Sequence, residues 1–227
     1  MKYITLFVIL GTCLTVLGIF LGFPGLLLFW LGLDFLIVAV AYAARDSGIF
    51  GKRASGQLSW GASLLLLPYL LFTWLIWHGQ RLLLREDAYN YIAPGLWMGR
   101  RLLRGELPPD IQLIVDLTAE FPEPQSVIRD KDYICLPTLD ANVPNLEAFR
   151  DLVKTIANCD GNVYIHCAIG HGRSATVAAA VLLEKGLAKD VQSAEDWLKK
   201  ARPWIKLNSA QRSLLERAIK SGSIPIL

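Results

Sequence analysis

The sequence predicts a chain of two parts: a membrane-spanning helical region, then an α/β domain with a central, largely parallel sheet flanked by helices. The first prediction rests on charge, because residues 1–80 hold only four of the 23 Lys and Arg and two of the 20 Asp and Glu. The second rests on periodicity. From about residue 88, short apolar runs alternate with segments of helical spacing, which is typical of α/β layer folds. We place the membrane region in residues 1–80, a charged linker in 81–91 and the α/β domain in 92–222.

Three apolar runs make up the helical region. They cover roughly residues 3–21, 26–44 and 58–77, and each is long enough for about 30 Å of hydrocarbon at about 1.5 Å per residue. A buried core helix or a signal peptide would explain one such run, but three in succession favour membrane spans. Asp34 interrupts the second run, and a carboxyl group there is expected to face a neighbouring helix.

The orientation in the membrane is open on charge alone. Three spans put the chain ends on opposite sides, and the basic residues nearest the spans, at 2, 45, 52 and 53, favour the C-terminal part outside. Counting basic residues through Arg104 makes the two sides nearly equal. The four cysteines lie in no paired or zinc-type spacing, which favours reduced thiols and a reducing compartment. We therefore expect the C-terminal part on the cytoplasmic face.

Four strands and four helices are expected in the α/β domain. Residues 111–117, IQLIVDL, are almost continuously apolar, as strands buried in a parallel sheet are. Residues 144–157 repeat apolar side chains at helical spacing, and Pro144 suits a helix start. Pro203 separates the last two helices. The expected strands are 96–99, 111–117, 133–137 and 162–166, and the expected helices are 144–157, 173–186, 191–201 and 208–220.

The segment 164–175, YIHCAIGHGRSA, carries the candidate site. It joins the end of an apolar strand to the start of an apolar helix, where backbone amides carry partial positive charge. Two glycines allow a tight loop whose N–H groups face one point, and such a loop suits a tetrahedral oxyanion. Arg173 adds a guanidinium fork that matches phosphate oxygens. The candidate phosphate-binding residues are Ala168, Ile169, Gly170, His171, Gly172 and Arg173.

Cys167 is the candidate nucleophile at the floor of this loop. The loop amides, the helix end and Arg173 favour its thiolate form, which can attack a bound phosphate in line and form a phosphocysteine. The hydroxyl of Ser174 can stabilise the departing thiolate when water breaks that intermediate. His166 can support the loop through hydrogen bonds.

The leaving group also needs a proton, and Asp140 in PTLDANVPNL is the candidate general acid. It lies between the third expected strand and the first long helix, where helix capping is the competing interpretation. Asp110 and Asp116 are alternatives, but Asp116 stands inside an apolar strand and is interpreted as a structural carboxylate. No spacing in the sequence indicates a metal site or a cofactor.

The segment HCAIGHGRSA resembles the HCxxGxxRS signature of the dual-specificity type of cysteine-dependent protein-tyrosine phosphatases. IAPGLWMGR, IVDLTAE, YICLPTLD and ARPWIKLNSAQRSLL resemble further segments of that family, so the resemblance covers about residues 90–220. It implies a dual-specificity-phosphatase-like fold, phosphoric monoester hydrolysis and no metal. It implies the following roles: Cys167 as nucleophile, Arg173 and 168–172 as phosphate binders, Asp140 as general acid and Ser174 as helper in hydrolysis. Residues 1–80 have no counterpart in its small soluble members.

The expected function is a membrane-anchored phosphatase that acts on phosphomonoesters, most similar to dual-specificity protein phosphatases. A lipid-phosphate phosphatase of the phosphatidylglycerophosphate or phosphoinositide type stays open. Ala168 and His171 stand where some phosphoinositide-cleaving relatives have lysines, which weakens that last alternative. A non-catalytic phosphate-binding scaffold also stays open, although the complete residue set argues against it. The Arg-Ser ending of the loop argues against a sulfur-transfer enzyme.

The expected partners are a phosphoprotein or phospholipid substrate and the lipid bilayer. Residues 81–227 carry 19 basic and 18 acidic residues, so no nucleic acid is indicated. Five arginines near the last span either hold the domain at anionic lipid or simply flank the span. They are Arg81, Arg85, Arg100, Arg101 and Arg104. A reactive thiolate is readily oxidised outside the cell, which again favours a cytoplasmic catalytic domain.

Overall fold

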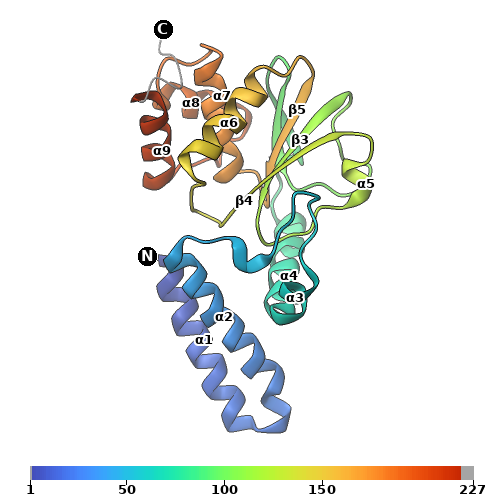
Figure 1. Ribbon diagram of the computed structural model, residues 1–227, viewed down its shortest axis with the longest axis vertical. Coiled ribbons are helices and arrows are strands. Elements are labelled where there is room, and N and C mark those ends of the chain that lie inside the picture. The colour runs from blue at the N-terminus through green and yellow to red at the C-terminus, as the bar shows by residue number, and fades with distance from the viewer. Residues whose placement is uncertain (1, 221–227) are drawn as a thin grey trace. The chain divides into compact units, whose positions relative to one another are not determined.

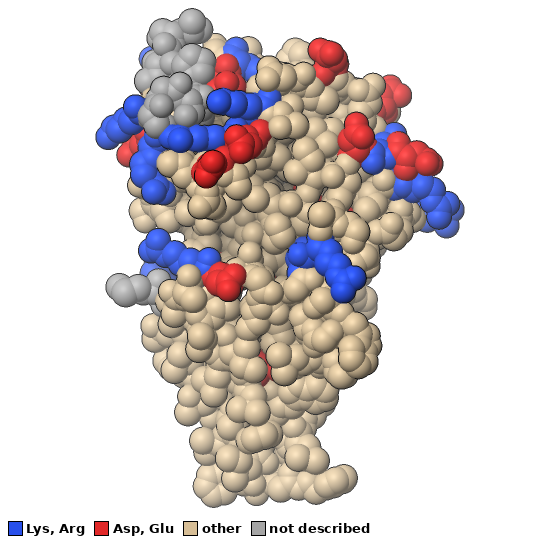
Figure 2. Space-filling view, viewed as in Figure 1, with Lys and Arg blue, Asp and Glu red and all other residues tan. Residues whose placement is uncertain are grey.

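The computed structural model describes residues 2–220, and these form two compact units (Figure 1). The helical unit takes its residues from Met1–Arg53, Gln57–Leu83 and Ala119–Pro122. The α/β unit takes its residues from Ala54–Gly56, Leu84–Thr118 and Glu123–Leu227. On the face shown in Figure 2, charged side chains gather over the α/β unit and are sparse over the helical unit.

The helical unit begins with a hairpin of α1 (Lys2–Leu21) and α2 (Leu26–Ala44). Both helices are long and apolar enough to cross a membrane, with mean hydropathies of 2.6 and 2.3 over their most apolar windows. Glycines let the two backbones approach closely. A Cβ atom on Gly18 would lie 2.5 Å from the backbone nitrogen of Phe29, and one on Gly32 would lie 2.5 Å from that of Thr15. Side chains larger than glycine would force the hairpin apart.

The third apolar run differs from the single helix that the sequence favours. It forms α3 (Trp60–Leu65) and α4 (Leu67–Leu83), with a break at Leu66 because Pro68 has no N–H and crowds the preceding turn. Two side chains of α2 form hydrogen bonds with backbone groups at this break. Trp30 Nε1 donates to Leu65 O at 2.9 Å, and Tyr69 N donates to Asp34 Oδ2 at 3.2 Å. The buried Asp34 thus faces a neighbouring helix.

The α/β unit contains a five-stranded sheet in the order β1-β2-β5-β3-β4. The strand β1 pairs antiparallel with β2, and all other pairs are parallel, so the prediction of a central, largely parallel sheet is confirmed. The strand bounds are β1 (Tyr89–Ala93), β2 (Leu96–Arg100), β3 (Ile111–Thr118), β4 (Asp132–Thr138) and β5 (Asn162–Cys167).

Helices cover one face of this sheet (Figure 1). They are α6 (Leu146–Ala157), α7 (Arg173–Glu184), α8 (Val191–Ala201) and α9 (Ser209–Lys220). Every residue of α7 from Arg173 to Leu183 is buried, and the core on this face includes Ile165 and Cys167. The opposite face carries Tyr164 in a smaller cluster with Val127 of the short helix α5 (Gln125–Ile128). Because side chains alternate along β5, Cys167 and His166 point to opposite faces of the sheet.

Candidate active site

The candidate loop, residues 168–172, connects the carboxyl end of β5 to the first residue of α7. Gly170 has a φ of +79°, and a Cβ there would lie 2.5 Å from the carbonyl carbon of Gly99 in β2. Only glycine combines this left-handed conformation with so close an approach to a neighbouring strand. The glycine therefore sets both the curvature of the loop and its packing against the sheet.

The sulfur of Cys167 lies inside this curve, and the side chain is buried. Gly170 N donates a hydrogen bond to Cys167 Sγ at 3.3 Å, and Ser174 Oγ lies 3.4 Å from the same sulfur. A backbone amide, a hydroxyl and the N-terminus of α7 thus surround one thiol. This environment stabilises negative charge on sulfur.

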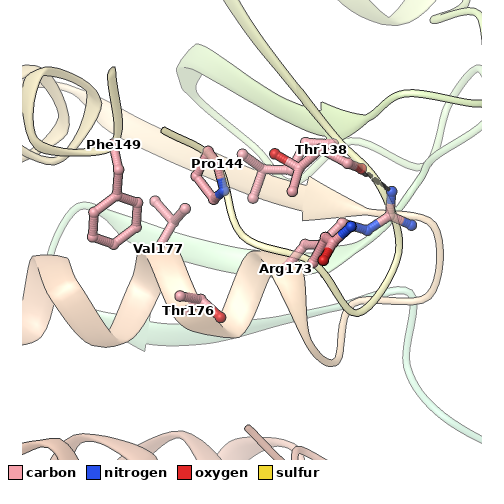
Figure 3. Close-up of a pocket in the computed structure, with 8 residues that line it drawn as sticks. Thr138, Pro144, Phe149, Arg173, Thr176 and Val177 are labelled. Carbon is pink, nitrogen blue, oxygen red and sulfur yellow. Dashed lines mark hydrogen bonds between the residues drawn. The ribbon is translucent and has the colours of Figure 1, made fainter. Parts of the chain in front are cut away.

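Arg173 is buried, and its guanidinium is fixed at the carboxyl ends of two strands. Arg173 NH1 donates to Thr138 O of β4 at 2.8 Å and to Leu117 O of β3 at 3.4 Å (Figure 3). Arg173 Nε lies 3.5 Å from Asp140 Oδ1. One edge of the guanidinium is therefore held by the sheet, while Asp140 contacts it through Nε.

Asp140 lies in residues 139–145, the acid loop between β4 and α6, and its side chain is 52% exposed. The next residue, Ala141, has a φ of 56°, which is strained for a residue other than glycine. Asn208 Nδ2 donates to Ala141 O at 2.8 Å, and Asn208 and Gln211 bond to each other's backbone nitrogens. The segment before α9 thus holds the acid loop in this conformation.

A cavity of about 10 Å³ lies beneath the acid loop (Figure 3). This is close to the space of a single water molecule, so a phosphate group does not fit there. Its lining residues are Leu117, Thr138, Asn142, Pro144, Phe149, Arg173, Thr176 and Val177.

The two alternative aspartates lie elsewhere. Asp110 precedes β3, whose first residue pairs with the first residue of β5, so it lies at the opposite end of the sheet from Cys167. Asp116 is fully buried and pairs with His166, on the face away from Cys167. Among these aspartates, Asp140 is the one for which the described residues give a contact with Arg173.

Asp116 takes part in a buried network on the far face of the sheet. Its Oδ1 accepts bonds from Thr118 N and Thr118 Oγ1, both at 2.7 Å, and its Oδ2 accepts one from the Tyr133 hydroxyl at 2.7 Å. Burial, and then the neighbouring charge of Asp116, raise the pKa of Tyr133 well above its usual range, so the phenol stays a donor. This carboxylate is a structural one, consistent with its place inside an apolar strand.

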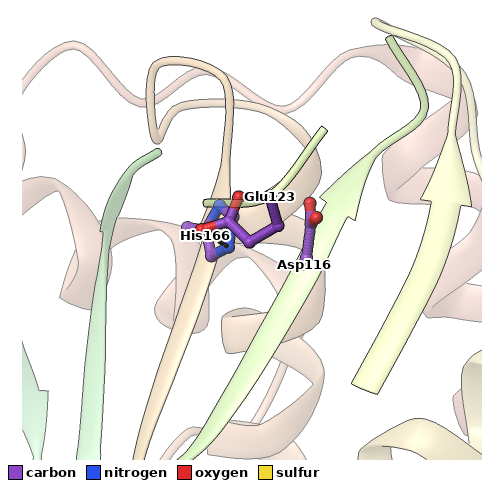
Figure 4. Close-up of side chains that lie close together, drawn as sticks. All are labelled: Asp116, Glu123 and His166. Atoms are coloured by element: carbon purple, nitrogen blue, oxygen red, sulfur yellow. Dashed lines mark ion pairs between the residues drawn. The ribbon is translucent and has the colours of Figure 1, made fainter. Parts of the chain in front are cut away.

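His166 lies beside Glu123 in the same network (Figure 4). Donor atoms of Asp116, Glu123 and His166 all lie within 4.8 Å of one another, a spacing that a metal ion could bridge. However, Arg101 Nε lies 3.3 Å from Glu123 Oε2, and His166 Nε2 lies 3.9 Å from Glu123 Oε1. A guanidinium already balances the Glu123 charge, so the donor set is better suited to an ion pair than to a cation.

Sequence reasoning did not identify Glu123 or Arg101 as parts of the site. Arg101 N also donates to Ala168 O of the candidate loop at 3.2 Å. A signal was available for Arg101, since Arg100 pairs with Cys167 across β2 and β5 and residues after neighbouring parallel strands meet at one edge. Nothing in the spacing of FPEP pointed to Glu123.

The five arginines near the last apolar run do not form one lipid-facing group. Arg101 is buried against Glu123, and Arg100 pairs with Glu106 at 3.3 Å. Arg81 lies over the Trp77 ring at 4.9 Å. Of the two interpretations left open for these arginines, lipid contact does not apply to Arg101, because its charge is used inside the α/β unit.

Comparisons with known proteins support the resemblance. Residues 108–220 match the family model described as dual specificity phosphatase, catalytic domain. Mouse dual specificity protein phosphatase 18 is 30% identical over 123 residues, which cover 52% of this chain and 63% of the relative. Human dual specificity protein phosphatase 15 is 30% identical over 132 residues, which cover 55% and 44%. The chain thus spans less than two thirds of the length of these relatives.

Solved structures share the fold of the α/β unit. The crystal structure of PTPMT1 in complex with PI(5)P has a TM-score of 0.54 at 21% identity, covering 60% of this chain and 96% of that one. Tk-PTP in the active form has a TM-score of 0.51 at 22% identity, covering 57% and 95%. Residues 108–220 thus match the dual specificity phosphatase catalytic domain in sequence, and the solved structures show that the α/β unit shares its fold with these phosphatases.

Proposed function

We propose that this protein is a membrane-anchored phosphatase that hydrolyses phosphomonoesters through a phosphocysteine at Cys167. The observation that carries the proposal is the surroundings of that sulfur. A loop amide and the Ser174 hydroxyl contact Cys167 Sγ, at the N-terminus of a helix that opens with a fixed arginine. The roles of Cys167, Arg173, Asp140 and Ser174 below belong to this proposal.

In the first step, the Cys167 thiolate attacks phosphorus opposite the leaving oxygen. The S–P bond forms as the P–O bond to the leaving group breaks, and Asp140 gives its proton to that oxygen. The loop N–H groups of residues 168–172 and the Arg173 guanidinium stabilise the charge on the other phosphoryl oxygens. The position of Asp140 supports this, because its carboxyl is half exposed and lies 3.5 Å from Arg173 Nε, at the edge of the oxyanion site.

In the second step, a water molecule attacks phosphorus and the S–P bond breaks. Asp140, now a carboxylate, takes a proton from the water, so the enzyme regains its starting protonation and inorganic phosphate leaves. Ser174 Oγ, 3.4 Å from the sulfur, donates to the departing thiolate. Every proton and electron pair is accounted for by groups of this chain and one water.

The favoured substrate is a phosphoprotein. Among the side chains of residues 168–172, His171 is the one that can carry positive charge, and it already contacts the Glu86 carboxylate. The loop therefore supplies little excess charge for a polyphosphorylated headgroup. A lipid phosphate is the second candidate, because the structurally similar PTPMT1 was solved with PI(5)P and because α1 and α2 are apolar enough for a bilayer.

We infer that α1 and α2 cross the membrane as a hairpin and that the α/β unit lies on the cytoplasmic side. Two spans return the chain to the side on which it began, so Lys2 and Arg45 share one side with all later basic residues. The positive-inside rule then places that side in the cytoplasm, and the charge count agrees with the reducing environment that a thiolate needs. A reporter fused after residue 227 should be cytoplasmic; an external reporter would favour three spans.

The activity is tested with the full chain in detergent or nanodiscs. We expect metal-independent hydrolysis of an aryl phosphate in the presence of EDTA, with inhibition by vanadate. A phosphopeptide panel and lipid phosphates in mixed micelles, assayed side by side, distinguish the two substrate classes. A folded chain that is inert in all three assays would favour the non-catalytic scaffold.

A further inference from the structure

One peptide group of the candidate loop, between Ile169 and Gly170, makes a hydrogen bond through both its C=O and its N–H. The Ile169 carbonyl accepts a hydrogen bond from Arg202 NH2 at 3.3 Å, and the N–H of the same peptide, that of Gly170, donates to Cys167 Sγ at 3.3 Å. The C=O and N–H of a trans peptide point in opposite directions. Whatever fixes the carbonyl therefore also aims the amide at the sulfur.

Arg202 is itself fixed from several directions, and its side chain is only 2% exposed. Arg202 NH1 donates to Asp87 O at 2.9 Å and to Asn90 Oδ1 at 2.7 Å. Arg202 NH2, the nitrogen that holds the loop carbonyl, donates to Glu86 Oε2 at 2.8 Å. Arg202 NH2 therefore bonds to the loop carbonyl on one side and to the Glu86 carboxylate on the other.

The same carboxylate oxygen also contacts the loop directly. His171 Nε2 lies 2.7 Å from Glu86 Oε2, and the two side chains are 18% and 15% exposed. An ionised carboxylate accepts hydrogen bonds and donates none, so Nε2 carries the proton in this contact. One oxygen of Glu86 therefore holds loop position 171 directly and position 169 through Arg202.

We propose that Glu86 is a positioning residue for the phosphate-binding loop, acting through Arg202 and His171. The proposal deepens the function proposed above, since it rests on residues 168–172 binding a phosphate group. Glu86 stands three residues after Leu83, the last residue of α4. It thus belongs to the first residues of the α/β unit, and a chain begun at residue 90 would lack it.

The experiment uses the full chain in detergent with Glu86→Ala and Glu86→Gln. The primary measurement needs no turnover: the tungstate concentration that half-protects Cys167 from iodoacetamide, followed by peptide mass spectrometry. We expect Glu86→Ala to raise that concentration and the KM for an aryl phosphate about tenfold, because a charge-assisted contact to the loop is lost. Glu86→Gln, whose amide oxygen still accepts, should lie between Glu86→Ala and the wild type.

Asp87→Asn is the matched control, because it removes the same charge one residue away while the exposed Asp87 side chain takes no part in these contacts. A merely structural role for Glu86 would reduce the amount of folded protein and leave half-protection and KM unchanged. Half-protection within twofold of wild type in Glu86→Ala would therefore overturn the proposal. An inert wild type that tungstate still protects would overturn only the proposed catalysis. An absence of protection in the wild type would overturn both.

The route through His171 is tested by a double-mutant cycle. If Glu86 acts through the loop histidine, His171→Gln should raise the half-protecting tungstate concentration much less in the Glu86→Ala background than in the wild type. Full additivity of the two changes would exclude that route.

Discussion

The α1–α2 hairpin and helix α7 are both rich in apolar side chains, yet they meet opposite surroundings. Phe20 and Phe23 of the hairpin region are 84% and 86% exposed, whereas Val181 and Leu182 of α7 are fully buried. The sheet and three helices cover α7 within the α/β unit. In the hairpin, α2 buries Phe35 and Val38, whereas the buried residues of α1 are two glycines, Gly11 and Gly18. Apolar composition alone therefore does not distinguish a helix buried in a protein core from a helix whose apolar side chains stay exposed.

The largest expected effect concerns one cysteine in each of the two units. Cys167→Ser should reduce phosphatase activity at least 10³-fold, because a serine hydroxyl at this position is not ionised near neutral pH. Steady-state hydrolysis of an aryl phosphate measures the effect. Cys13→Ser, which changes the exposed cysteine of α1, is the matched control and should keep wild-type activity. Equal activity of the two variants would remove Cys167 from the mechanism.

The next effect concerns one carboxylate in the α/β unit and one in the helical unit. Asp140→Asn should lower kcat by about 10²–10⁴, the usual contribution of a general acid, with a smaller loss on substrates whose leaving group needs no proton. Asp46→Asn, in the loop after α2, is the control and should not change kcat. A wild-type rate in Asp140→Asn would identify another group as the proton donor.

The packing comparison is sharpened by two leucines. Leu182→Ala in α7 should cost about 2–5 kcal/mol of folding free energy, because it opens a cavity in a filled core. Leu27→Ala in α2, at a side chain that is 64% exposed, should cost less than about 0.5 kcal/mol in detergent. Urea unfolding of both variants under the same conditions gives the comparison. Similar losses would mean that the hairpin side chain is packed as tightly as the core.

The smallest effect concerns helix capping, which differs between α2 of the helical unit and α8 of the α/β unit. The helix α2 has Gly25 at its N-cap position and no side-chain cap, whereas Asp190 caps α8 by accepting from Ser193 N at 2.7 Å. The bond from the Ser193 backbone lowers the pKa of Asp190 below its usual range, so its stabilisation is present at neutral pH and is lost as pH falls through the lowered pKa. Asp190→Ala should lower the melting temperature at pH 7, and the deficit should shrink as the Asp190 carboxylate becomes protonated at acidic pH. A deficit that is independent of pH would contradict an ionised cap.

The fold of the α/β unit was predictable where the signal is local. The four strands and four helices expected from periodicity correspond to β2–β5 and α6–α9. The strand–loop–helix order placed Cys167, the two glycines and Arg173 together, because they are neighbours in the chain. The antiparallel strand β1 and the helix α5 were both missed, since five and four residues carry too little periodicity to detect.

The contacts that complete the site were not predictable, because they join distant parts of the chain. Glu86 and His171 are 85 residues apart, and Arg202 is 116 residues from Glu86. A single charged residue in a polar junction has no periodicity and no motif, so the sequence suggested only a linker there. The break before Pro68 was likewise hidden, because its broken turn is served by Trp30 and Asp34, far away in the sequence.

The strand order has a consequence for oxidative damage. Cys135 and His166 both pair with Asp116, from β4 and β5 on its two sides, so Cys135 lies about 9–10 Å from that row of β5 and on the face away from Cys167. A disulfide needs Cα atoms within about 7 Å. Cys159 precedes β5, at the end of the strand remote from Cys167. A sulfenic acid formed on Cys167 therefore has no resolving thiol within the α/β unit, and its recovery depends on small-molecule thiols or on attack by a neighbouring backbone nitrogen.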